Sequence, residues 1–179
     1  MSTDLAGLLV KWLTHDFASP IATAMTASEL LSNTPDAEIN ELVQDATRRL
    51  AARLRLIRAA LAPGDAPIGG PALEKLIREG IDGTPLTWAH APSDTDGSLA
   101  AVIAGTALLL ADLRRGQMLT ITATGIHWAT AAPLPESVAQ SLTGAPANDS
   151  RSAVAALLAA AAARAGLVLT ATADGIAWA

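Results

Sequence analysis

A segment rich in proline and glycine, PGDAPIGGP at residues 63–71, divides this chain of 179 residues into two unlike parts. Three prolines and three glycines within nine residues cannot continue a helix, so the segment predicts a linker between domains. We expect residues 1–62 to form one domain and residues 72–179 to form a second. The chain is long enough for two small domains with real cores.

The residues before the linker have the periodicity of two long helices. Within residues 3–33 the apolar positions recur at steps of three and four and share one side of a helix: Val10, Leu13, Phe17, Pro20, Ala24, Ala27 and Leu31. Residues 37–62 carry a similar stripe, and the turn between them, Asn33-Thr34-Pro35-Asp36, is short enough to make the two helices antiparallel. A lone hairpin would leave part of each stripe in water, so we expect a homodimer with a four-helix bundle.

The residues after the linker alternate between helix and strand patterns. Expected helices span residues 72–79, 98–113, 136–142 and 152–165, and an expected strand spans residues 85–90. Residues 117–129 and 167–179 read as hairpins, and within them LTITATGIHWA closely resembles LTATADGIAWA. These patterns predict one antiparallel sheet covered on one side by helices, a two-layer α/β sandwich, so the fold class is α+β.

Composition limits the partners and the compartment. The net charge of −5 argues against nucleic acid or an anionic membrane as a general partner. The chain has no cysteine, which excludes disulfides and thiolate chemistry. Its first four residues lack the basic region of a signal peptide, and the apolar run 153–163 is shorter than the about 20 residues that span a bilayer. We therefore expect a cytoplasmic protein with no membrane contact.

His15 points away from the apolar stripe of the first helix. Its neighbours on that side are mostly small or polar: Lys11, Ala18, Ser19, Ala22 and Thr26. An imidazole nitrogen is a good nucleophile at neutral pH, and a nearby carboxylate can hold its tautomer and stabilise its cation. The arrangement suits a histidine that carries a phosphoryl group, with Asp16 as the orienting or proton-accepting partner. Adjacent helical residues diverge by about 100°, so this carboxylate would have to swing back toward the ring.

The sequence around His15 resembles a known phosphoacceptor motif. Residues 15–20, His-Asp-Phe-Ala-Ser-Pro, match the box His-Asp/Glu-x-x-Ser/Thr-Pro of two-component histidine kinases. With the following Glu29-Leu30-Leu31 and the order of elements over nearly the whole chain, the sequence more closely resembles the ChpT-type histidine phosphotransferases of alphaproteobacteria. That family often places Asn-Gly just before the glutamate, where this chain has Thr26-Ala27-Ser28.

The resemblance implies that His15 shuttles a phosphoryl group between aspartates of receiver domains, in a hybrid histidine kinase and in response regulators. It also implies a second domain similar to the ATPase domain of histidine kinases. That family holds Mg²⁺ through an asparagine on its first main helix and cradles the nucleotide with Asp-x-Gly-x-Gly loops. Helix 98–113 has no asparagine, Gly-x-Gly occurs nowhere, and Asp94-Thr95-Asp96-Gly97 lacks the second glycine.

Backbone amides cannot approach phosphates closely without such glycines. We therefore expect a degenerate domain that binds no nucleotide, no metal ion and no cofactor, with Mg²⁺ supplied by the partner receiver domain.

The hairpin register predicts a docking surface around His15. The turn centres near residue 35, so His15 is level with residues 53–58, and Arg53, Arg55 and Arg58 offer cations there, although a helical arginine most often only faces solvent. Leu8 and Trp12 lie on or near the His15 side and form an apolar patch for a receiver domain or for the second domain of the partner subunit. The expected docking residues are Leu8, Lys11, Trp12, Ala18, Ser19, Ala22, Arg53, Arg55 and Arg58.

Other histidines and other functions are weaker candidates. His90 and His127 lack neighbours spaced as metal ligands, and the pair of Ser19 with His15 lacks the third acid of a hydrolase. Two alternatives to the shuttle stay open. One is a non-catalytic scaffold that regulates receiver domains, and the other is a phosphatase acting on phosphorylated receivers.

Overall fold

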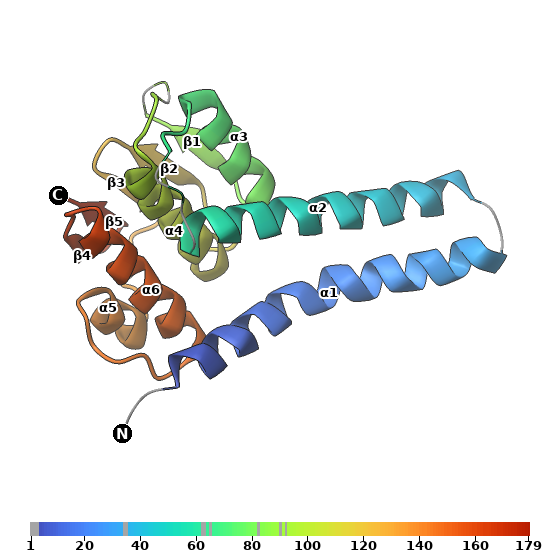
Figure 1. Ribbon diagram of the computed structural model, residues 1–179, viewed down its shortest axis with the longest axis horizontal. Coiled ribbons are helices and arrows are strands. Elements are labelled where there is room, and N and C mark those ends of the chain that lie inside the picture. Colours follow the sequence, from blue (N-terminus) through green and yellow to red (C-terminus); the bar gives the residue numbers. More distant parts are fainter. Residues whose placement is uncertain are drawn as a thin grey trace.

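The computed structural model describes residues 4–33, 36–61, 64, 66–81, 83–89, 91 and 93–179. The centre of the predicted turn at residues 34–35, parts of the predicted linker and His90 lie outside these ranges. Helices α1 (Leu5–Asn33) and α2 (Ala37–Leu61) form a long antiparallel hairpin whose far end projects from a body built by the rest of the chain (Figure 1). Among the described helices, none is both long and apolar enough to cross a membrane.

The body follows the order of elements that the sequence predicts, and the α+β fold class is confirmed. Its elements are α3 (Gly70–Gly80), β1 (Leu86–Trp88), α4 (Gly97–Leu113), β2 (Leu119–Thr122), β3 (Gly125–Trp128), α5 (Glu136–Leu142), α6 (Ser150–Arg164), β4 (Leu169–Ala171) and β5 (Gly175–Trp178). Helix α3 begins inside the segment predicted as a linker. Pro71 lies in its first turn, where a proline breaks no helical hydrogen bond, so the proline starts this helix rather than excluding it.

The five strands form one sheet in the order β1-β2-β3-β5-β4. Four of them belong to the two expected hairpins, which join through the antiparallel pair β3–β5. The expectation of a wholly antiparallel sheet is wrong at one edge, because β1 pairs with β2 in parallel. Helix α4 lies between these two strands in the chain and provides the crossover that a parallel pair requires.

The sequence repeat in the hairpins is also a structural repeat. In each hairpin a threonine hydroxyl donates to the carbonyl oxygen of the glycine that begins the second strand, at 3.0 Å in one and 3.2 Å in the other. Ile126 pairs with Ile176, and the backbone N–H groups of Trp128 and Trp178 each donate, at 2.8 Å, to a turn carbonyl of the opposite hairpin. The two hairpins are therefore related by a local two-fold axis and close each other's ends.

Helix α4 is the centre of the core. Every residue from 100 to 111 is buried, which is typical of a helix that is apolar on all sides and covered on all sides. It packs against the sheet on one side and against α2 and α6 on the others. At Gly105 an added Cβ would lie 3.1 Å from Leu158 of α6 and 3.7 Å from Ala60 of α2, so this glycine lets the helices approach closely.

The hairpin and the body share one hydrophobic core. Leu56, Ile57 and Ala60 near the C-terminal end of α2 are buried in the same cluster as Leu73 and Leu108. Part of the apolar stripe of α2 is thus covered within the chain. Other apolar side chains of the hairpin stay exposed, namely Val10, Ile21, Met25, Leu30, Leu42 and Leu54.

We predict that Leu56→Ala lowers the free energy of unfolding by about 2–5 kcal/mol, the usual cost of truncating a fully buried leucine. The side chain of Leu56 is 0% exposed, whereas that of Leu30, the matched control, is 52% exposed. Urea denaturation followed by circular dichroism should show one transition, shifted for Leu56→Ala and nearly unchanged for Leu30→Ala. A separate transition for the hairpin, or a body unaffected by Leu56→Ala, would contradict a shared core.

Candidate functional site

His15 lies on the solvent side of α1, as the helical periodicity predicts. Lys11 and Ser19, one turn before and one turn after it, are exposed as well, and so are Ala18 and Ala22. Lys11 is the only lysine or arginine in α1. The imidazole therefore stands on a rigid helix among small and polar side chains, with one cation in the neighbouring turn.

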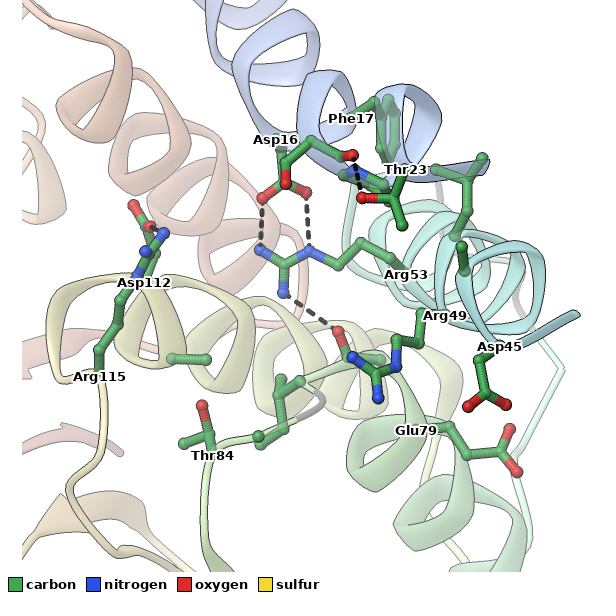
Figure 2. A pocket seen from close by; sticks show the side chains of 18 of the residues that line it. Asp16, Phe17, Thr23, Asp45, Arg49, Arg53, Glu79, Thr84, Asp112 and Arg115 are labelled. Carbon is green, nitrogen blue, oxygen red and sulfur yellow. Dashed lines mark hydrogen bonds and ion pairs between the residues drawn. The ribbon is translucent and has the colours of Figure 1, made fainter. Parts of the chain in front are cut away.

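Asp16 turns toward α2 and forms a two-point ion pair with Arg53 (Figure 2). Nε and Nη2 of Arg53 donate to the two carboxylate oxygens at 2.8 and 3.0 Å, and each side chain is only 17% exposed. The third guanidinium nitrogen, Nη1, donates to the carbonyl oxygen of Gly80 at 3.1 Å. Parallel N–H···O bonds of this kind are among the stronger and more directional contacts of charged side chains. One arginine thus joins α1, α2 and the end of α3.

In this geometry Asp16 does not contact the His15 ring as the orienting or proton-accepting partner that the sequence suggested. Both carboxylate oxygens accept hydrogen bonds from Arg53, on the side of α1 that faces α2, while His15 faces solvent. The expected swing of the carboxylate back to the imidazole is not the arrangement seen. In this structure Asp16 fixes the helix that carries the histidine rather than the histidine ring.

Pro20 interrupts the hydrogen-bond ladder of α1 at the same place. A proline has no backbone N–H, so Pro20 cannot donate to the carbonyl of Asp16 four residues earlier. Helix α1 nevertheless continues from Leu5 to Asn33. The Arg53 contact therefore supports the turn of α1 whose own backbone bonding is weakest.

The three arginines predicted to lie level with His15 have different surroundings. The register prediction is confirmed for Arg53, which reaches Asp16, but its low exposure removes it from the expected free docking surface. Arg55 stays exposed, with 62% of its side chain open to solvent, although its Nη1 lies 3.9 Å from Glu79 of α3. Arg58 is exposed.

Trp12 is buried, which contradicts the expectation of an exposed apolar patch. Its side chain is 6% exposed and belongs to the main hydrophobic core. Helix α1 contacts α6 of the same chain, near the N-terminal end of α1 (Figure 1), so the body itself contributes to the burial of Trp12. Leu8, one turn earlier, is half-buried.

A cleft of about 520 Å³ opens beside the ion pair, between the hairpin and the body. Its lining includes Ser19 and Thr23 of α1, Asp45 and Arg49 of α2, Glu79 of α3, Asp112 of α4 and Arg115 just after α4, and all of these but Ser19 are labelled in Figure 2. Its charges compensate each other, since Asp112 accepts from Arg115 at 3.3 Å and from Arg151 at 3.1 Å. His15 is not among the residues that line this cleft.

Metal-binding side chains do not gather at this site. Within the part of the chain that the structure describes, no three histidine, aspartate or glutamate side chains lie close enough together to hold a metal ion. His127 lies in β3, where its Nδ1 is 3.9 Å from Asp174, far from α1 in the sequence.

The fold as a whole is similar to that of a solved bacterial phosphotransferase. The two structures superpose with a TM-score of 0.70 at 21% sequence identity, over 98% of this chain and 94% of that chain. The histidine kinase domain of a blue-light-activated kinase from Erythrobacter litoralis EL346 gives a TM-score of 0.41 at 9% identity, over 90% of this chain and 92% of that one. No protein-family model matches the sequence, and no curated protein sequence matches it. The first comparison shows that the two chains share a fold from end to end.

We predict that Trp12→Ala destabilises the protein by about 3–5 kcal/mol, because it empties a large volume in the core. Trp12→Phe keeps most of that volume and should cost less. Thermal and urea unfolding measure both effects. Unchanged stability of Trp12→Ala together with weaker binding of a receiver domain would return Trp12 to the exposed docking surface.

Proposed function

We propose that this protein is a histidine phosphotransferase, in which His15 carries a phosphoryl group between aspartates of receiver domains. The observation that carries the proposal is the exposed imidazole of His15 within the box His15-Asp16-Phe17-Ala18-Ser19-Pro20, on a helix that is fixed to the body. The end-to-end similarity to a phosphotransferase fold supports transfer of a phosphoryl group in general. The receiver domains are inferred from the motif.

Phosphoryl transfer requires of this chain mainly that it holds the nucleophile His15 in position. A ring nitrogen of neutral His15 attacks the phosphorus of a phosphoaspartate, the new N–P bond forms in line with the breaking P–O bond, and the aspartate leaves as a carboxylate. The imidazolium then releases its ring proton to water, because Asp16 is held by Arg53. The reverse transfer loads the acceptor aspartate, and the receiver domain brings the Mg²⁺ that neutralises charge on the phosphoryl oxygens.

The loop most similar to a nucleotide-binding motif has another use in this protein, which supports a function without ATP. In Asp94-Thr95-Asp96-Gly97, Asp94 accepts from the backbone N–H of Gly70 at 3.2 Å, at the start of α3. Asp96 caps α4 by accepting from the N–H of Ser98 at 2.8 Å. Both carboxylates thus bind helix N-termini, and the glycines that would let a phosphate approach are missing from the sequence.

The exposed apolar residues of the hairpin support a homodimer. Val10, Ile21 and Met25 share one side of α1, and Leu54 is exposed on α2. A second copy of the hairpin would cover these side chains in a four-helix bundle, with His15 left facing solvent on another side of α1.

The central test is transfer of ³²P from a phosphorylated receiver domain. We expect the wild-type protein to acquire acid-labile, base-stable label, His15→Ala to acquire none, and His127→Ala to behave like the wild type. Mg-ATP alone should leave all three unlabelled. Label on His15→Ala would refute the assignment.

The same experiment separates the alternatives. A scaffold would bind the receiver domain without acquiring label, and a phosphatase would release inorganic phosphate from the receiver without a stable phosphohistidine.

We also predict that Met25→Glu converts a dimer to a monomer, since a charge would then have to be buried in the apolar interface of the bundle. Thr26→Glu, one position further and exposed on the His15 side, should leave the dimer intact. Sedimentation equilibrium at micromolar concentration measures both. A wild-type protein that sediments as a monomer would exclude the bundle.

A further inference from the structure

We propose that Arg53 is a positioning residue for phosphotransfer, which holds the turn of α1 bearing His15 at a fixed place through Asp16 and does not bind the partner itself. This inference rests on the proposed function. It replaces the simplest reading of an arginine level with His15, namely a cation that attracts an acidic receiver domain.

The contacts of Arg53 are those of an internal brace. All three nitrogens of its guanidinium donate within the chain, two to Asp16 at 2.8 and 3.0 Å and one to the carbonyl of Gly80 at 3.1 Å. The two charged side chains are each 17% exposed. Three of the five N–H donors of this guanidinium are used within the chain and its charge is paired, so it has less to offer a partner protein than an exposed arginine.

Helix α1 needs such a brace at this point. Before the site, Trp12 anchors the helix in the main core. After it, Pro20 removes the N–H that would bond to the carbonyl of Asp16, so the turn containing His15 lies between the part of α1 that packs on the body and the part that projects with α2 (Figure 1). In-line phosphoryl transfer depends on the position of the nucleophile, and a misplacement of about 1 Å can cost about a hundredfold in rate. The ion pair limits the movement of this turn.

The test is single-turnover transfer from a phosphorylated receiver domain, measured over a range of receiver concentrations. This yields a maximal rate and a half-saturating concentration for each variant. For Arg53→Gln and Arg53→Lys we expect the maximal rate to fall about ten- to hundredfold, with the half-saturating concentration unchanged within about twofold. Lysine keeps the charge but cannot make the two-point pair and also reach Gly80. Arg48→Gln, in the same helix and with a side chain that is 70% exposed, is the matched control and should leave the maximal rate unchanged.

The exchange Asp16→Arg with Arg53→Asp restores an ion pair between α1 and α2. It should recover part of the maximal rate that each single variant loses, which a loss of folding alone would not produce. Should Arg53→Gln unfold, Arg53→Lys and this exchange give the answer.

Three results would overturn the inference. A higher half-saturating concentration at an unchanged maximal rate would make Arg53 a docking residue. A maximal rate that rises for Arg53→Gln, with a pH dependence that is lost in Asp16→Asn, would mean that freed Asp16 serves as the proton acceptor of His15. Unchanged kinetics in all variants would leave the ion pair without a part in transfer. Failure of the proposed function differs from all of these, because the wild-type protein itself would then acquire no label.

Discussion

The insertion of the C-terminal end of α2 into the core of the body is the constraint on which the rest of the structure depends. Leu56 packs where α2 crosses the end of α3, and a Cβ on Gly80 would lie 2.5 Å from that of Leu56. Only a glycine allows this approach, and the same approach brings the carbonyl of Gly80 within reach of Arg53. The packing of Leu56 against Gly80 thus brings the carbonyl of Gly80 to Arg53, and Arg53 in turn pairs with Asp16 of α1. Without this insertion, the hairpin would meet the body through α1 alone, where Trp12 joins the core and α1 contacts α6.

Two adjacent residues differ in their surroundings at this site. His15, the phosphoacceptor in the proposed function, is exposed, whereas Asp16 is held in the ion pair with Arg53. A nucleophile that meets large partner domains gains from exposure, but exposure normally comes with mobility. Here the residue next to the nucleophile is tied down at two oxygens, so the imidazole is accessible while its backbone is held.

Much of this could be predicted from the sequence, because local patterns determine local structure. The periodicity of α1 predicts the exposure of His15, the hairpin register places Arg53 level with His15 and so close to Asp16, and α5 begins and ends where its pattern does. The parts that could not be predicted depend on contacts between elements. Trp12 lies close to the His15 side of α1, and only the packing of the body against α1 decides that Trp12 is buried while His15 stays exposed.

The parallel pairing of β1 has the same cause. The sequence of the three-residue strand Leu86–Trp88 does not indicate whether it pairs with β2 in parallel or antiparallel. The sequence does not predict the start of α3 at Gly70, for another reason. Pro71 reads as a sign of a linker, but a proline is also well suited to the first turn of a helix.

The two-fold relation between the hairpins has a consequence for how the chain acquires its fold. The sheet is joined at its middle by Ile126 and Ile176, which are far apart in the sequence, whereas the helical hairpin can close from its turn outward before longer contacts form, such as that of Asp16 with Arg53, 37 positions apart. Pairings of distant segments carry a larger loop-closure entropy and form more slowly than local ones. We therefore expect the meeting of the two β-ribbons to be slower than the closure of the helical hairpin, and each ribbon leaves a hydrogen-bonding edge open until the other arrives.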